Sequence, residues 1–359
     1  MEDMNLPFDE LNLRISNAVS FEHLGEERNQ FNQMIQNFLS SIEEIKIKEI
    51  TLINEIHDLF IQRTITLSEI ELEDRGFGPP PVSYDFILFG SGGRFEQTLW
   101  SDQDNGLIYE DTNHDQKETI DAYFKELAVC IEQGLEKAGY PPCDGKVICT
   151  NSLWNKSLEE WVIKMNDWFE DPHWEHVRYL LILADSRSVY GEGKLVKKMK
   201  DIYLKKVTST STILDKMMHN TLHHKILLGV FGHLIKEQYG EKAGGLDIKY
   251  GAYIPMVNGI RLLSIEAEIF ETSTLERIQK LKQLNVVPER YALEYESAFT
   301  HIFKLRFKTL YKEENGLYTS NGILKAKQLT KDQREKLKSS LRIGNKLQKY
   351  IKKKIDSSS

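Results

Sequence analysis

Two chemical signals share one short stretch of this sequence, Phe86-Ile-Leu-Phe-Gly-Ser-Gly-Gly-Arg-Phe-Glu-Gln-Thr-Leu-Trp-Ser-Asp-Gln-Asp-Asn-Gly-Leu-Ile-Tyr109. The first is an apolar run that ends abruptly in Gly90-Ser91-Gly92-Gly93, a pattern typical of a buried strand entering a tight turn. The second is the pair Asp102 and Asp104 at the head of another apolar run. Because side chains at i and i+2 of a strand point to the same face, we expect both carboxylates to converge on one cation or pair of cations.

Length and charge narrow the possible classes of protein. A chain of 359 residues, of which 40% are hydrophobic, can bury one large core or two to three smaller ones, so we expect more than one domain. The formal net charge of −7 argues against a general nucleic-acid binder, because such proteins usually carry an excess of Lys and Arg. No apolar run approaches the roughly 20 residues that a membrane helix needs, so we expect no membrane insertion.

The cysteines and the N-terminus favour a cytoplasmic location. Cys130, Cys143 and Cys149 are odd in number and lack the CxxC or Cys/His spacing of a zinc site, so we expect reduced thiols. The N-terminus has neither the basic region nor the apolar region of a secretory signal peptide.

Helical patterns lie on both sides of the central stretch. Between about residues 20 and 70, apolar residues recur at helical spacing and predict two or three amphipathic helices, which a stiff linker at Gly76-Phe-Gly-Pro-Pro-Pro81 follows. From Thr210 onward the pattern predicts about five helices in a bundle. We expect these helices near residues 212–237, 255–271, 274–284, 288–312 and 330–354.

The middle of the chain predicts a small α/β unit. A short helix from about Gly93 to Leu99 should join the first two strands, and a helix ending at Gly139 should precede a third strand, Val147 to Cys149. Two more helices should follow near residues 158–169 and 174–184. We therefore expect an α+β fold in which a small mixed-sheet domain at 81–205 follows a helical region at 1–80 and precedes a helical bundle at 206–359.

Three familiar motifs nearly match the central stretch and fail. A dinucleotide-binding fingerprint would need glycine where Phe95 stands, and a Walker A loop would need Gly-Lys-Ser/Thr where the chain continues into Arg94-Phe95-Glu96. An EF-hand starting at Asp102 requires glycine at its sixth position, but Gly106 is the fifth. What remains is a Gly-Ser turn after a strand, coupled to Asp-x-Asp at the head of the next.

Phosphoryl and nucleotidyl transfer need these parts. Backbone N–H groups of a glycine-rich turn can approach triphosphate oxygens closely, because glycine has no side chain in the way. Two carboxylates can hold Mg²⁺ ions, about 3.5–4 Å apart, that bridge the phosphates and activate an attacking hydroxyl.

Gly90-Ser91 with Asp102-x-Asp104 resembles the signature of the DNA polymerase beta nucleotidyltransferase superfamily. The fuller stretch is similar to the branch that contains the bacterial PII-protein uridylyltransferase and its signal-transduction relatives. Further segments resemble that branch, so the similarity covers most of the chain after about residue 45. They are Gly139-Tyr-Pro-Pro-Cys-Asp-Gly145, Trp154-x-x-Ser157-Leu-x-x-Trp161, Asp185-Ser-Arg187-x-x-Tyr-Gly191 and Leu246-Asp-Ile-Lys249.

The resemblance implies a polymerase-beta-like domain and a set of roles. Gly90 and Ser91 would hold the nucleotide phosphates, and the catalytic Asp102 and Asp104 would bind two Mg²⁺ ions. Arg94 could reach a phosphate, or it could be a surface charge on the short helix. Lys249 could reach the triphosphate or the acceptor, although a surface or capping role is at least as common for such a residue.

A third carboxylate is the open question of the predicted site. Many superfamily members carry one on a later strand, and the strand predicted at 147–149 has none. Asp144 and Asp185 are the two candidates, and we count Asp185 among the expected metal ligands. The alternative for Asp185 is a structural ion pair with Arg187. In the helical region, His219 and His223 have zinc-compatible spacing, but no glutamate stands at 220 as HExxH requires, so we expect no metal there.

The sequence and the resemblance together predict a cytoplasmic, Mg²⁺-dependent nucleotidyltransferase. It would move UMP or AMP from a nucleoside triphosphate to an acceptor hydroxyl and release pyrophosphate, and the resemblance implies a protein acceptor of the PII kind. Two alternatives stay open: a regulatory protein that binds nucleotide without turnover, and a small-molecule nucleotidyltransferase of the aminoglycoside-modifying kind.

Overall fold

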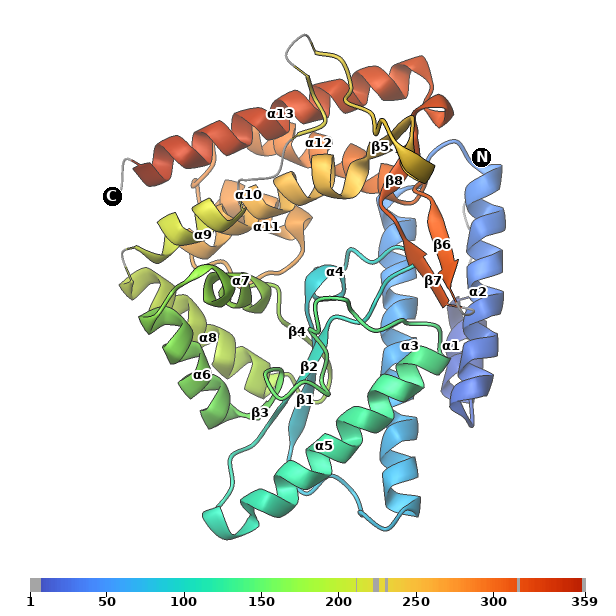
Figure 1. The fold of residues 1–359 in the computed structure, drawn as a ribbon, viewed down its shortest axis with the longest axis vertical. Coiled ribbons are helices and arrows are strands. Elements are labelled where there is room, and N and C mark those ends of the chain that lie inside the picture. The colour runs from blue at the N-terminus through green and yellow to red at the C-terminus, as the bar shows by residue number, and fades with distance from the viewer. Residues whose placement is uncertain (1–7, 211, 222–225, 230–231, 315–316, 357–359) are drawn as a thin grey trace. The chain divides into compact units, whose positions relative to one another are not determined.

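The computed structural model describes residues 8–210, 212–221, 226–229, 232–314 and 317–356 (Figure 1). The chain divides into two compact units. The first unit contains Met1–Lys164, Asp185–Met199 and Glu313–Thr319, and the second contains Met165–Ala184, Lys200–Lys312 and Ser320–Ser359. The division predicted at 80/81 and 205/206 stays a prediction.

A four-stranded mixed sheet, ordered β3-β2-β1-β4, lies in the first unit. β1 (Tyr84–Leu88) pairs antiparallel with β2 (Asn105–Tyr109) and with β4 (Arg187–Tyr190), and β2 pairs parallel with β3 (Asn155–Ser157). Every residue of β1 and β2 is buried, as expected for the two central strands of the sheet. The expected α+β fold with a small mixed sheet is confirmed.

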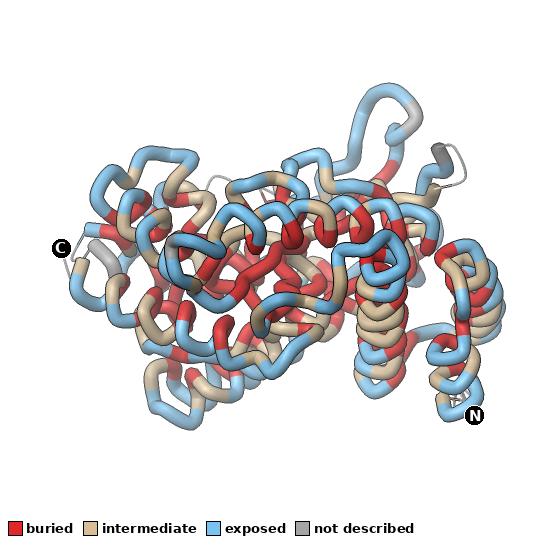
Figure 2. Tube along the Cα trace, turned by 90° about the horizontal axis from the view of Figure 1, so that it is seen from below, coloured by how far each residue is buried: buried red, intermediate tan, exposed pale blue. Residues whose placement is uncertain are grey.

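Helices precede and follow these strands in the first unit. α1 (Phe8–Ser16), α2 (Phe21–Ser41) and α3 (Ile47–Asp74) come first, and the amphipathic helices predicted between residues 20 and 70 are confirmed as α2 and α3. Ser20 caps α2 by accepting the N–H of His23 at 3.1 Å. α4 (Gly90–Gly93) follows β1, and α5 (His114–Lys137) packs against α3. Figure 2 shows buried and exposed positions along the helices, as amphipathic patterns predict.

The second unit is mainly helical. α10 (Ile254–Glu266) is its most buried helix, since every residue from Pro255 to Ile265 is buried, and three of its neighbours pack around it. These neighbours are α9 (Ile213–Thr221), α11 (Thr274–Gln283) and α13 (Lys331–Asp356). The remaining helices that begin in or pass through this unit are α6 (Leu158–Glu170), α7 (Trp174–Leu183), α8 (Lys194–Ser209) and α12 (Glu289–Arg306).

Short elements complete the fold. A five-residue π-helix (Lys249–Tyr253) precedes α10, and 3-10 turns occur at Gly240–Lys242 and Ala326–Gln328. β5 (Gly245–Asp247) pairs antiparallel with β8 (Ile323–Lys325), and β6 (Tyr311–Glu314) pairs with β7 (Leu317–Ser320). None of the described helices combines the length and the apolar character needed to cross a bilayer. The three cysteines are free thiols, as predicted.

Two predicted elements near the sheet are wrong. Residues 147–149 form no strand; instead, Val147 and Cys149 are buried in a loop that contacts Asn105, while the third strand is Asn155–Ser157. The short helix predicted from Gly93 to Leu99 is also absent. The observed helix, α4, spans Gly90–Gly93 and cannot continue, because Phe95 adopts a positive φ of 57° that a helix cannot include.

Two helices predicted in the C-terminal region are too long. The helix predicted at 212–237 ends at Thr221, and Leu228 and Leu234 form an isolated antiparallel bridge. His223 lies outside the described residues. The helix predicted at 288–312 ends at Arg306, since the chain enters β6 at Tyr311. The strand β4 and the helix α8 were not predicted.

Asp85 fastens the start of α8 to the sheet. Its side chain, on β1 and 2% exposed, accepts the N–H of Gly193 at 2.7 Å, of Leu195 at 2.9 Å and of Val196 at 3.0 Å. These amides are the unpaired donors of a helix N-terminus, so one buried carboxylate replaces the usual N-cap residue. The apolar run of β1 is interrupted by an aspartate for this reason.

We predict that Asp85→Ala lowers the free energy of unfolding by about 2–3 kcal/mol, because it leaves buried amides without an acceptor. Urea denaturation followed by circular dichroism measures this. Asp111→Ala is the matched control, since exposed Asp111 accepts the N–H of Glu159 at 2.7 Å at the start of α6, and its loss should cost less than about 1 kcal/mol. Equal losses in the two variants would contradict the anchoring role of Asp85.

Candidate active site

The turn after β1 is shaped around the carboxylate of Asp104. Gly90 has a φ of +52°, and a Cβ placed on it would collide with Oδ2 of Asp104. Both facts require glycine at this position. The N–H of Phe89 also donates to the carbonyl of Asp104 at 2.9 Å. Gly90 and Asp104, fourteen residues apart in sequence, are therefore in direct contact.

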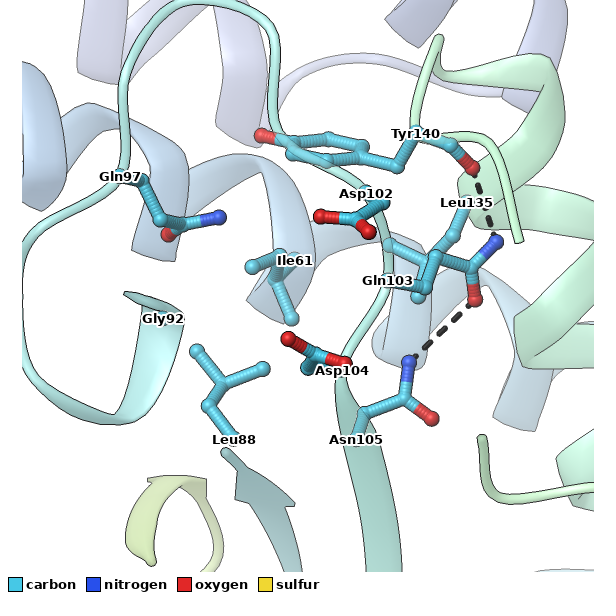
Figure 3. A pocket seen from close by; sticks show the side chains of 10 residues that line it. All are labelled: Ile61, Leu88, Gly92, Gln97, Asp102, Gln103, Asp104, Asn105, Leu135 and Tyr140. Atoms are coloured by element: carbon cyan, nitrogen blue, oxygen red, sulfur yellow. Dashed lines mark hydrogen bonds between the residues drawn. The ribbon is translucent and has the colours of Figure 1, made fainter. Parts of the chain in front are cut away.

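Asp102 and Asp104 lie on one side of the segment that leads into β2. Both are half-buried, while the intervening Gln103 and the following Asn105 are buried. Figure 3 shows the two carboxylates pointing away from the amides of Gln103 and Asn105 and into the same pocket. This arrangement is the one expected for alternate residues of an extended segment.

The amides of Gln103 and Asn105 hold the aspartate segment in place. Gln103 Nε2 donates to the carbonyl of Tyr140 at 2.9 Å, and Asn105 Nδ2 donates to Gln103 Oε1 at 3.3 Å (Figure 3). Asn105 Oδ1 accepts the N–H of Cys149 at 2.8 Å. The sequence interpretation missed both residues. Their only signal was the alternation of amides with the two aspartates.

The pocket has mixed character. Its lining includes the polar side chains of Asp102, Asp104, Gln97, Gln103 and Asn105. Its apolar lining comes from Ile61 on α3, Leu88 on β1, Leu135 on α5, and Tyr140 (Figure 3). The two carboxylates therefore lie beside both polar and apolar atoms.

Two neighbouring side chains hold Tyr140 in place. Its hydroxyl bonds to His57 Nδ1 at 2.8 Å, and the guanidinium of Arg28 lies 3.3 Å from its ring centroid. Arg28 is 1% exposed and donates to the carbonyl of Leu99 at 3.2 Å. Burial lowers the pKa of Arg28 to about 9, and burial together with the charge of Arg28 holds the pKa of His57 well below its usual value.

Arg94 is buried rather than a surface charge, so that alternative is wrong. It is 4% exposed, and its guanidinium contacts Asp185 Oδ2 at 2.6 Å and Glu96 Oε2 at 2.8 Å. Gly93 adjoins the same aspartate, since a Cβ on Gly93 would collide with the carbonyl oxygen of Asp185. Asp104 and Asp185 thus contact opposite ends of α4. Phosphate binding by Arg94 and metal binding by Asp185 stay predictions.

Arg187 does not pair with Asp185, as one alternative supposed, but holds the turn. Its guanidinium makes two bonds to the Asp58 carboxylate, at 2.7 and 2.9 Å, and donates to the carbonyl of Gly92 at 2.9 Å. It also lies 3.5 Å from the ring centroid of Phe95. Arg187 on β4 therefore connects α3 to the Gly-Ser turn, a role that sequence alone did not indicate.

The other predicted residues differ in their surroundings. Ser91 is half-buried beside Gly90, and Asp144 is exposed in a turn. Lys249 lies in the second unit, where its Nζ is 5.4 Å from the ring centroid of Tyr250, and its role toward a nucleotide stays a prediction.

Burial and the neighbouring Asp104 carboxylate raise the pKa of the Cys143 thiol to about 12, which keeps the thiol protonated and unsuited to be a nucleophile.

The donors at this site fit Mg²⁺. Magnesium prefers carboxylate oxygens and usually keeps several waters, so a protein commonly holds it with one or two carboxylates plus substrate phosphates. Asp102 and Asp104 offer two half-buried carboxylates beside a turn whose glycine leaves room at the Asp104 oxygen. The arrangement can hold a cation and bring an anionic ligand against it.

Two parts of the chain match known families. Residues 29–175 match the family model described as "Putative nucleotidyltransferase DUF294". Residues 211–355 match the model described as "Putative nucleotidyltransferase substrate binding domain". No curated protein matches the sequence. The matches indicate a nucleotidyltransferase domain with a substrate-binding domain, and the Gly-Ser turn, Asp102 and Asp104 all lie in the first matched segment.

We predict that Gly90→Ala displaces the Asp104 carboxylate and lowers the free energy of unfolding by about 2–3 kcal/mol, because a strained φ and a collision act together. Gly78→Ala is the matched control, since Gly78 has a φ of +74° and nothing within 4 Å of a Cβ. It should cost about 1 kcal/mol. Thermal or urea denaturation of both variants gives the difference, and a Gly90 variant no less stable than the Gly78 variant would contradict the contact.

The lowered pKa of His57 predicts how the free energy of unfolding depends on pH. The unfolded chain binds a proton at this histidine below about pH 6.5, while the folded protein does not, so the free energy of unfolding should fall as pH drops below 6.5. His57→Gln should reduce that slope by up to about 1.4 kcal/mol per pH unit. Urea denaturation between pH 7.5 and pH 5 measures it. The exposed His219→Asn is the control, and an unaltered slope in the His57 variant would refute the assignment.

Proposed function

We propose that this chain, in which family matches indicate a nucleotidyltransferase with its substrate-binding domain, transfers UMP or AMP from a nucleoside triphosphate to an acceptor hydroxyl with the help of Mg²⁺. One observation carries the proposal. The carboxylates of Asp102 and Asp104 enter one pocket, and Asp104 lies directly against the glycine of the Gly-Ser turn. Cation ligands and a phosphate-binding turn are thereby adjacent.

Each part has a defined chemical task in this reaction. The acceptor oxygen attacks the α-phosphorus, the bond from that phosphorus to the oxygen bridging to the β-phosphate breaks, and pyrophosphate leaves. Asp102 and Asp104 would hold Mg²⁺, which neutralises charge on the phosphates and favours ionisation of the acceptor hydroxyl. The backbone of Gly90 and Ser91 would contact the phosphates, where the missing side chain allows close approach. Rigid positioning accounts for much of the catalysis in such reactions.

Asp185 is the better candidate for a third carboxylate. It is buried against Gly93 at one end of α4 while Asp104 contacts Gly90 at the other end, whereas Asp144 is exposed on a turn. Arg94 holds Asp185 at 2.6 Å, and this ion pair would keep the carboxylate ionised and oriented. Asp185→Asn should therefore reduce transfer far more than Asp144→Asn does.

The same ion pair favours one alternative. If Arg94 keeps Asp185 from a metal, the site would bind nucleotide without turnover and act as a regulatory module. For the active enzyme, the resemblance supports a protein acceptor of the PII kind. The three free cysteines support a reducing, cytoplasmic location.

We predict that the protein transfers label from α-labelled UTP or ATP to an acceptor in a cell lysate when Mg²⁺ is present. Asp102→Asn and Asp104→Asn should each reduce transfer by roughly 100-fold or more, because each removes a ligand that neutralises phosphate charge. Glu110→Gln, an exposed carboxylate at the end of β2, is the control and should retain full activity.

The location of the label separates the alternatives. Label on a protein band supports a protein acceptor, and label on a low-mass product supports the aminoglycoside-modifying kind of activity. Nucleotide binding in equilibrium dialysis without any transfer supports the regulatory module. Transfer that persists in both aspartate variants would refute the proposed site.

A further inference from the structure

A cluster of one carboxylate and two imidazoles lies in the second unit, in the turn between α6 and α7. Asp171 directly follows α6, His173 is the N-cap residue of α7, and His176 is in the first turn of α7. One possible ligand atom from each of the three lies within 4.8 Å of the others. This is the spacing at which three donors can reach one ion.

The hydrogen bond of His176 is a second observation, and it fits the role of a metal ligand. Its Nδ1 lies 2.7 Å from the backbone carbonyl oxygen of Asp171. A carbonyl can only accept, so Nδ1 carries the proton and Nε2 presents a lone pair. Histidines that bind metals almost always donate their other ring N–H to a carbonyl, a carboxylate or a water in this way.

The backbone of the turn arranges the cluster in advance. The carbonyl of Asp171 also accepts the N–H of His173 at 2.9 Å, and the N–H of Asp171 donates to the carbonyl of Asp167 at 3.0 Å. The carbonyl of His173 accepts the N–H of Val177 at 3.0 Å, which begins α7. The two imidazole rings lie with centroids 3.7 Å apart and planes inclined by 32°. An ion would therefore find its ligands near their final positions.

We propose that Asp171, His173 and His176 bind a divalent transition metal, with Zn²⁺ as the expected ion. Two imidazoles and one carboxylate are a donor set that suits Zn²⁺, Co²⁺ or Ni²⁺, whereas Mg²⁺ prefers oxygen ligands alone. Three protein ligands leave a position for water. The exposure of Asp171 and His173 gives the ion direct access from solvent.

This site is separate in chemistry from Asp102 and Asp104 and does not rest on the proposed transferase activity. Its consequence is structural. An ion bound by residues at the end of α6 and the start of α7 would fix the turn that joins them, and it would stabilise the folded chain because the unfolded chain does not hold the three ligands together. Because imidazole must be unprotonated to bind a metal, the affinity should fall in acid.

Titration of the untagged, full-length protein with Co²⁺ tests the proposal, since a Co²⁺ ion held by nitrogen and oxygen ligands absorbs visible light. We expect a saturable absorption band that added Zn²⁺ removes. His173→Asn and His176→Asn should each weaken Co²⁺ binding at least tenfold, in line with losses of about 10–100-fold even for residues behind the ligands. Asp171→Asn should also weaken it, although it keeps the backbone carbonyl that orients His176.

Two controls isolate the cluster. His219→Asn removes an exposed histidine whose Nε2 lies 3.5 Å from Asp215, a pair with too few ligands for a strong site, and it should leave binding unchanged. Glu110→Gln, which removes an exposed carboxylate outside the cluster, should also leave the band unchanged. Zn²⁺ should raise the melting temperature of the wild type but not of the His173/His176 double variant. No saturable band in the wild type, or undiminished binding in the three cluster variants, would overturn the proposal.

Discussion

The contact between Gly90 and Asp104 leaves no room for a side chain at residue 90. The carboxylate of Asp104 lies where a Cβ of residue 90 would be, and the backbone of Asp104 accepts the N–H of Phe89. The end of β1 and the segment before β2 are therefore locked together at one point. The strand register follows from it, since Leu88 lies opposite Asn105 directly beside that contact. The proposed transfer reaction requires this proximity between a phosphate-binding turn and a cation-binding carboxylate.

Charged pairs surround the turn, and those of Arg94 are buried while that of Arg187 is half-buried. Arg94 lies between Glu96 and Asp185, and Arg187 lies between Asp58 and the carbonyl of Gly92. Removing one partner of the buried Arg94–Asp185 pair would leave an uncompensated charge away from water, which is strongly unfavourable. Arg187 also donates to the carbonyl of Gly92, so its pairing holds the backbone of α4 in place.

Local patterns in the sequence were sufficient to predict some strands, helices and site residues, but not others. The strands β1 and β2, the helices α5 to α7 and the pair Asp102 and Asp104 could be predicted, because apolar periodicity and turn residues are adjacent in the chain. The strand Asn155–Ser157 could not, since three polar residues become a strand only by pairing with β2. Arg187 acts through Asp58 and Gly92, which are far away in sequence, so no spacing indicated it. The helix predicted at 212–237 was too long. Apolar residues continue at helical spacing in the sequence beyond Thr221, but Leu228 and Leu234 pair in a bridge instead.

The order of strands in the sheet also affects how the chain folds as it is synthesised. β1 has β4 as one of its neighbours, and β4 lies about 100 residues later in the chain. At typical synthesis rates, roughly 5 to 20 s pass between the emergence of these two strands from the ribosome. During that interval one edge of β1 has no strand to pair with, and Arg94 lacks Asp185. Nascent chains would thus carry an open sheet edge, the kind of surface that chaperones bind and that otherwise leads to aggregation.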